Sequence, residues 1–186
     1  MIIGIPKEIK PQENRVGLTA NSVKSLVDEG HEVIIETNAG NGSGFQDSDY
    51  LEAGGKIIDT AKEIFDHAEM IVKVKEPQSQ EVNLLKKGQN LFTYLHLAAD
   101  KKLTEGLISS GSTCIAYETV TDDNNRLPLL APMSEVAGRI SIQAGARSLE
   151  MTNNGRGVLL SGATGAPPAD VVLSLIHISE PTRRIH

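Results

Sequence analysis

Three side chains in separate stretches of the sequence could together bind and transform a small organic acid: Arg15, Lys75 and His96. Each lies in or just after a segment whose pattern predicts a β-strand, where an open α/β sheet carries its working residues. Arginine can grip a carboxylate through two parallel hydrogen bonds, lysine adds a compact positive charge, and histidine can exchange a proton near neutral pH. The set suits an anionic substrate with a carbonyl or amine beside its carboxylate.

The residue types by themselves leave structural alternatives open. Arg15 could be a solvated charge on a hairpin, Lys75 a charge at the end of a strand, and His96 a hydrogen-bonded histidine of the core. Spacing along the sequence does not show that the three meet in space. His31 and His67 have no comparable context, and we expect them on a surface turn and at a helix end.

An alternation of strand-like and helix-like segments predicts how these side chains are positioned. Helix N-caps are predicted at Thr19, Thr60 and Asp100, and Gly30 and Gly111 are predicted to end the first and last of these helices. Apolar, β-branched runs predict strands at residues 2–5, 31–36, 70–75, 90–95 and 114–119. This rhythm predicts an α/β fold of three layers, with a largely parallel sheet, helices on both faces and a Rossmann-like arrangement.

Composition excludes several classes of function. The 186 residues are 39% hydrophobic and 23% charged, which is typical of soluble globular proteins. A net charge of −6 and an aromatic content of 3% argue against nucleic-acid partners. No stretch approaches the roughly 20 apolar residues of a membrane span, and the apolar run at the N-terminus is too short for a signal peptide. Cys114 is the only cysteine, which fits a reducing compartment, so we expect a cytoplasmic protein whose cysteine is buried rather than reactive.

Residues 131–172 differ in sequence pattern from residues 1–130, which we assign to a first domain. Residues 134–151 predict a long helix that contains glycines at 138 and 145. Each glycine inside a helix costs about 1 kcal/mol relative to alanine, and close approach of another backbone usually offsets that cost. We therefore interpret this segment as an interdomain or intersubunit helix. Residues 155–160 and 169–172 then look like the opening of a second α/β domain, which is truncated.

The last residues have a different origin in our interpretation. Residues 173–183 (LSLIHISEPTR) resemble the in-frame translation of a transposon-adaptor end that is used in preparing sequencing libraries. The alternative is a natural C-terminus. We assign residues 173–186 to a non-native tail and exclude them from reasoning about the fold.

Six short motifs, in the same order, resemble the N-terminal half of the alanine dehydrogenases. They are residues 4–10 (GIPKEIK), 15–19 (RVGLT), 39–45 (AGNGSGF), 73–77 (KVKEP), 96–99 (HLAA) and 131–139 (APMSEVAGR). The resemblance covers residues 1–172. It implies a substrate domain packed against an NAD-binding domain, oxidation of L-alanine to pyruvate and ammonia with NAD as cofactor, and assembly into a homo-hexamer.

The resemblance also implies roles for individual residues. Arg15 and Lys75 match the ligands of the substrate carboxylate and carbonyl oxygen, and His96 matches the acid/base that moves the proton as the carbinolamine forms and collapses. Met133 would lie near the substrate and Ser134 at the cofactor, at the N-terminus of the long helix, where free backbone N–H groups suit a polar ligand. The alternative for both is an ordinary N-cap region.

Two glycine-rich segments fall short of a dinucleotide fingerprint. Residues 40–44 (GNGSG) invite interpretation as a phosphate loop but lack the GxGxxG spacing, so we favour a tight loop of the substrate domain. Residues 162–165 (GATG) fail the same test. The sequence holds no complete fingerprint and no cluster with metal-ligand spacing. The fragment that this sequence spells is therefore expected to be inactive by itself.

Two other hypotheses compete with an alanine dehydrogenase. One is the corresponding part of a proton-translocating pyridine nucleotide transhydrogenase, which shares the fold and much of the pattern; His96 favours the dehydrogenase. The other is a non-catalytic fragment that binds substrate but cannot hold a cofactor.

Overall fold

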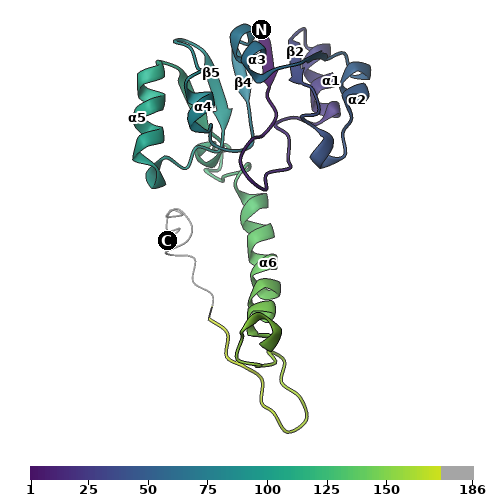
Figure 1. The fold of residues 1–186 in the computed structure, drawn as a ribbon, viewed down its shortest axis with the longest axis vertical. Coiled ribbons are helices and arrows are strands. Elements are labelled where there is room, and N and C mark those ends of the chain that lie inside the picture. The colour runs from purple at the N-terminus through teal and green to yellow at the C-terminus, as the bar shows by residue number, and fades with distance from the viewer. Residues whose placement is uncertain (173–186) are drawn as a thin grey trace. The chain divides into compact units, whose positions relative to one another are not determined.

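A six-stranded parallel sheet forms the centre of the first part of the chain in the computed structural model, which describes residues 1–172. Its order is β3-β2-β1-β4-β5-β6, and Figure 1 labels β2, β4 and β5. The chain thus builds outward from β1 on one side and then, from β4, on the other. The carboxyl ends of β1 and β4 flank this switch point, where open α/β sheets bind ligands. The strands are β1 (Ile2–Ile5), β2 (Glu32–Glu36), β3 (Lys56–Ile58), β4 (Met70–Val72), β5 (Asn90–Thr93) and β6 (Thr113–Ala116).

Helices cover both faces of this sheet, as the sequence predicts. Along β2, Val33 and Ile35 pack in one core with residues of α1 and α2, whereas Ile34 packs in the other core with residues of α3 and α5. Alternate side chains of a strand point to opposite faces, so the two cores lie on opposite sides of the sheet. The helices are α1 (Ala20–Asp28), α2 (Asp47–Glu52), α3 (Ala61–His67), α4 (Ser79–Val82) and α5 (Lys101–Ser110).

The predicted helix caps are present. The side chains of Thr19 and Thr60 accept hydrogen bonds from the backbone N–H three residues later, both at 3.3 Å. Asp100 does the same for α5 at 2.9 Å. Gly111 follows α5 with a φ of 68°, a left-handed conformation that glycine adopts without steric cost.

Some boundaries differ from the prediction. The strand predicted at residues 70–75 ends at Val72, because the backbone N–H of Val74 turns to the carboxylate of Glu8 at 2.6 Å instead of a neighbouring strand. The strand predicted at 114–119 passes at Tyr117 into a short 3₁₀ helix, η3 (Tyr117–Thr119). Three short elements of three to six residues, β3, α2 and α4, were not predicted from the sequence.

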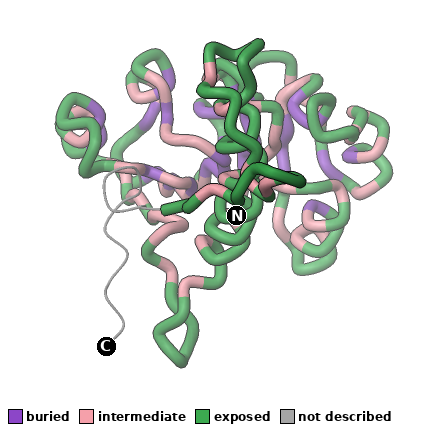
Figure 2. Tube along the Cα trace, turned by 90° about the horizontal axis from the view of Figure 1, so that it is seen from below, coloured by how far each residue is buried: buried purple, intermediate pink, exposed green. Residues whose placement is uncertain are grey.

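A second compact unit begins at Thr121. Its main element is α6 (Ala131–Leu149), followed by the 3₁₀ helix η4 (Met151–Asn153). The helix begins three residues before the predicted start, and Pro132 in its first turn suits that position because proline lacks an N–H group. No described residue of this unit is buried, in contrast to the first unit (Figure 2). The assignment of domains at 1–130 and 131–172 stays a prediction.

The expected opening of a second α/β domain does not form strands in the part of the chain that the structure describes. Residues 155–172 contain turns and one isolated bridge between Ala163 and Ala166. A β-strand needs a neighbouring strand to satisfy its backbone groups, and residues 121–172 hold none. The predicted non-native tail, residues 173–186, lies outside the described residues. Among the helices of residues 1–172, none combines the length and the apolarity that crossing a membrane requires.

Candidate functional site

Arg15 lies in the loop that follows β1 and is held by a neighbouring glutamate. Its Nε and Nη2 atoms donate to the two carboxylate oxygens of Glu13 at 2.8 and 2.6 Å, and its backbone N–H donates to the same carboxylate at 2.9 Å. The hydrogen bonds from Arg15, with a smaller contribution from the charge of Lys75, lower the pKa of Glu13 to about 2, although partial burial opposes the shift. Glu13 therefore stays ionised and keeps the guanidinium oriented.

The glycine-rich loop at residues 40–44 supports the Arg15 loop. Ser43 donates its hydroxyl to the backbone carbonyl of Asn14 at 3.0 Å. A Cβ on Gly42 would lie 2.5 Å from that carbonyl oxygen, so glycine allows the two loops to approach. The segment forms only a three-residue 3₁₀ helix, η1 (Asn41–Ser43). Its contacts are those of a tight supporting loop, and a small cavity of about 180 Å³ lies beside it, lined by Arg15, Glu13 and Glu8 among others.

Lys75 follows β4, next to β1 in the sheet. Its backbone is held on both sides: the N–H donates to Glu8 at 3.3 Å, and the carbonyl accepts from the hydroxyl of Thr93 at 2.9 Å. Thr93 is fully buried, and its hydrogen bond to Lys75 is partly buried. The positive charge of Lys75 also contributes to the lowered pKa of Glu13.

His96 follows β5 in a left-handed conformation, with φ 50° and ψ 38°. Such a conformation costs energy for a residue with a side chain, so the surroundings must compensate. The carboxylate of Glu118 does so by accepting the backbone N–H groups of His96 at 2.9 Å and of Leu95 at 3.1 Å. Because Glu118 follows β6, it fixes the end of the neighbouring strand β5.

Tyr94 packs against His96. Its ring stacks on the His96 ring with centroids 6.2 Å apart and an angle of 18° between the planes. Burial raises the pKa of Tyr94, and the nearby positive charge of Arg15 opposes that shift. Arg15, Lys75 and His96 thus follow β1, β4 and β5, which are adjacent parallel strands, so all three come after the carboxyl edge of one sheet.

Sequence reasoning missed the acidic and aromatic residues that hold these three in place: Glu8, Glu13, Tyr94 and Glu118. Glu8 and Glu13 lie in or beside the motifs that carry the resemblance, which was a usable signal. Glu118 offered none, since its role depends on the pairing of β5 with β6.

Met133 and Ser134 belong to the second unit and lie within the first turn of α6. The expectation of free backbone N–H groups at Met133 and Ser134 is wrong, because both groups donate to the carbonyl of Leu130 at 3.1 Å. The reason is the earlier start of the helix. Leu130, which has no capping side chain, is the N-cap residue, so the alternative of a Ser134 cap is also wrong.

Cys114, His31 and His67 also carry side chains that could do chemistry, but their contacts belong to the fold. Cys114 is partly buried and packs against the core beneath α3 and α5. His67 is in the last turn of α3, with Nδ1 2.8 Å from the carbonyl of Glu63, and His31 lies on the turn before β2. Within residues 1–172 no group of three or more His, Cys, Asp or Glu side chains is arranged to hold a metal ion.

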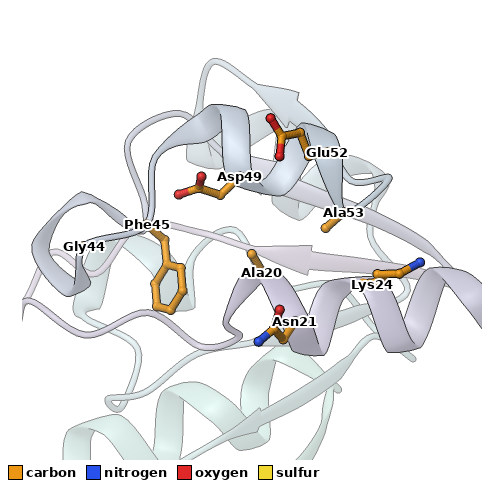
Figure 3. Close-up of a pocket in the computed structure, with 8 residues that line it drawn as sticks. All are labelled: Ala20, Asn21, Lys24, Gly44, Phe45, Asp49, Glu52 and Ala53. Atoms are coloured by element: carbon orange, nitrogen blue, oxygen red, sulfur yellow. The ribbon is translucent and has the colours of Figure 1, made fainter.

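A larger hollow of about 470 Å³ lies between α1 and α2 (Figure 3). Lys24 lines it from α1, and Asp49 and Glu52 line it from α2. Asp49 already accepts the backbone N–H of Gln46 at 2.7 Å as part of the helix cap. None of the predicted site residues line this hollow, and we assign it no function.

Comparison with known proteins points to the alanine dehydrogenases and their relatives. The family described as "Alanine dehydrogenase/PNT, N-terminal domain" matches residues 4–137. The alanine dehydrogenases of Methanococcus maripaludis and Halomonas elongata are 56% and 54% identical to the chain over 173 residues, which are 93% of this chain and 46% and 47% of theirs. The chain thus spans about half the length of the curated relatives that it matches.

Solved structures show the same relationship. An L-alanine dehydrogenase superimposes with a TM-score of 0.79 and 57% identity, over 90% of this chain and 46% of that one. A transhydrogenase from Sinorhizobium meliloti superimposes with a TM-score of 0.63 and 28% identity, over 67% of this chain and 35% of that one. The chain therefore belongs to the family that contains the alanine dehydrogenases and the pyridine nucleotide transhydrogenases.

Proposed function

We propose that this chain is the substrate-binding half of an NAD-dependent alanine dehydrogenase, an enzyme that converts L-alanine to pyruvate and ammonia. The observation that supports the proposal is that Arg15, Lys75 and His96 follow three adjacent parallel strands, β1, β4 and β5, at the carboxyl edge of the sheet. The similarity to curated alanine dehydrogenases supports the choice of substrate.

In this proposal each residue has one task. Arg15, oriented by Glu13, binds the substrate carboxylate through a preorganised fork, so that little entropy is lost on binding. Lys75 places its ammonium against the carbonyl oxygen of pyruvate or of the carbinolamine. His96 takes and returns the proton as water adds and ammonia leaves. Met133 as a substrate contact and Ser134 as a cofactor contact remain part of the proposal.

The described residues do not fit NAD by themselves. Residues 40–44 contain a three-residue turn that packs on Asn14, and the second segment, residues 162–165, is held by an isolated bridge between Ala163 and Ala166. The helix that follows the first segment, α2, carries the acidic Asp47 and Asp49 in its first turn, which disfavours a pyrophosphate there, and no helix follows the second segment among the described residues. The chain's own contribution is therefore substrate binding and proton transfer, and we expect no NAD reduction by the 186-residue chain with L-alanine.

A transhydrogenase is the second candidate, favoured by the structural match to the Sinorhizobium meliloti protein. It would bind nucleotide without oxidising alanine, so alanine-dependent activity separates the two. The family resemblance further supports a homo-hexameric assembly and a cytoplasmic location, which size-exclusion chromatography with light scattering and cell fractionation would test.

A chimera tests the proposal directly. Residues 1–172 would be joined to the remaining part of the Methanococcus maripaludis alanine dehydrogenase, and NADH formation with L-alanine would be followed by absorbance. We expect activity, a higher KM for Arg15→Ala, and a turnover about 10²–10⁴-fold lower for His96→Ala, the usual contribution of a general acid/base. His67→Ala, at the end of α3, is the matched control and should leave the rate unchanged. An inactive chimera, or a His96→Ala chimera of normal turnover, would contradict the proposal.

A further inference from the structure

A buried cluster of three charged side chains lies beneath the candidate site. The ammonium of Lys73 donates to Oε2 of Glu8 at 3.1 Å and to Oε1 of Glu81 at 2.7 Å. The Lys73 side chain is 0% exposed, and the side chains of the two glutamates are each 3% exposed. Burial raises the pKa of Glu81, and the charge of Lys73 opposes that rise.

Stability alone does not explain why a chain keeps such a cluster. Charges lose their hydration when they are buried, and their mutual attraction often does no more than offset that loss. Apolar side chains of similar size would frequently give a fold that is at least as stable. A role in fixing one local geometry is the alternative, and it depends on what else the two carboxylates contact.

The two glutamates differ in their second contacts. The remaining oxygen of Glu8 accepts the backbone N–H groups of Val74 at 2.6 Å and of Lys75 at 3.3 Å. The remaining oxygen of Glu81 accepts the N–H of Gln78 at 2.7 Å, at the start of α4. Glu8 therefore reaches the backbone of a proposed substrate ligand, whereas Glu81 completes a helix cap.

Glu8 also joins two loops of the site. It lies in the loop after β1 that leads to Arg15, and it bonds to the segment after β4 that carries Lys75. With the hydroxyl of Thr93 holding the Lys75 carbonyl, the backbone of Lys75 is fixed from both sides. We propose that Glu8, anchored by Lys73, is a positioning residue that sets Lys75 relative to Arg15 and thereby makes the site recognise a carbonyl beside a carboxylate.

This inference rests on the proposed function, in which Arg15 binds the carboxylate and Lys75 the carbonyl oxygen. If Glu8 acts through Lys75, its loss should weaken ligands that carry a carbonyl and spare those that carry only a carboxylate. A purely structural role would instead weaken both ligands in parallel. The ratio of the two affinities is thus the informative quantity.

The test compares pyruvate with propionate, which has the same carbon count and no carbonyl. Dissociation constants for the 186-residue chain would be measured by ligand-observed NMR, well below the thermal midpoint of each variant. We expect the wild-type chain to prefer pyruvate. Glu8→Gln should lower the affinity for pyruvate by about tenfold, because a small displacement of a positioned group is costly, while propionate binding changes by less than about twofold.

Glu81→Gln is the matched control. It removes an equally buried carboxylate from the same lysine but touches neither Val74 nor Lys75. We expect a loss of thermal stability similar to that of Glu8→Gln, with an unchanged preference for pyruvate. If the two variants have the same preference, Glu8 has no positioning role, although the proposed function would stand.

A second variant covers the case in which Glu8→Gln does not fold. Replacing Glu8, Lys73 and Glu81 together by methionine removes every charge of the cluster and fills its volume, a change that folds often tolerate. We expect a folded chain that binds pyruvate and propionate about equally. A folded triple variant that still prefers pyruvate would overturn the inference. A wild-type chain with no preference for pyruvate would overturn both the inference and the assignment of Lys75.

Discussion

The two units of the chain differ in how far they bury their own side chains. The first contains two apolar cores, one on each face of the sheet, with Ile5, Ile64 and Phe65 fully buried. In the second, no described residue is buried, and Ile140 and Ile142 of α6 are about half exposed. A helix that is stable in a globular protein normally packs an apolar stripe against something. The candidate site at the edge of the sheet therefore lies on the unit whose core is formed by its own residues.

Truncation of core side chains should show the largest difference between the units. Phe65→Ala removes a ring that is 0% exposed, and we expect a loss of about 3–5 kcal/mol in the free energy of unfolding of the first unit. Ile140→Ala on α6, where the side chain is 51% exposed, should change stability by less than about 0.5 kcal/mol. Urea denaturation followed by circular dichroism measures both. Equal effects would contradict the contrast in packing.

The ion pair of the first unit should contribute more to stability than the ion pair of the second, but this difference should be smaller than that between the core side chains. Interaction with Arg15 lowers the pKa of Glu13 from 4.5 to about 2. A carboxyl with a lowered pKa stabilises the fold above its ordinary pKa and loses that contribution as the pH falls through about 2. We expect Glu13→Gln to lower stability by about 1–2 kcal/mol near pH 6, a range that allows for solvent around the partly exposed Arg15, and the gap should close toward pH 2.

Glu135→Gln provides the matched control in α6. Its carboxylate pairs with Arg139 at 2.7 Å, but both side chains are more than 60% exposed. An exposed pair four residues apart contributes about 0.3–0.5 kcal/mol at most. Denaturation at a series of pH values should therefore show a nearly pH-independent difference for Glu135→Gln. A Glu13→Gln curve parallel to that of the wild type would show that the Arg15–Glu13 pair is not formed in solution.

Features that depend on neighbours along the chain could be predicted from the sequence, whereas contacts between separate segments could not. Helix caps at Thr19, Thr60 and Asp100 depend on neighbours along the chain, so local pattern was sufficient. The alternation of strands and helices predicted a parallel sheet, and parallel strands place their carboxyl ends at one edge. The role of Glu118 depends on the pairing of β5 with β6, which no local pattern encodes. The motif around Glu8 indicated this residue but not its contact with the segment after β4. The start of α6 at Ala131 was missed because Ser134 resembled a better cap than Leu130.

The smallest expected effect concerns the glycines, and it tests the interpretation of α6 most closely. A Cβ added at Gly138 or Gly145 meets no atom within 4 Å, whereas one added at Gly42 would lie 2.5 Å from the carbonyl of Asn14. Gly138→Ala and Gly145→Ala should therefore each stabilise the helix of the 186-residue chain by up to about 1 kcal/mol, because alanine loses less backbone freedom. Gly42→Ala should instead destabilise the first unit, since one backbone would have to move.

The chimera with the remaining part of an alanine dehydrogenase gives these glycines a second test. An interdomain or intersubunit helix requires that another backbone approaches α6 in the chimera. In that case the methyl groups added by Gly138→Ala and Gly145→Ala should lower the activity of the chimera or disturb its assembly. The same substitutions should raise the helix content of the 186-residue chain. Circular dichroism of the chain, together with size-exclusion chromatography and activity of the chimera, measures both effects. Gains in helix content with unchanged assembly and activity would show that α6 needs no close backbone partner, and its glycines would then have no packing role.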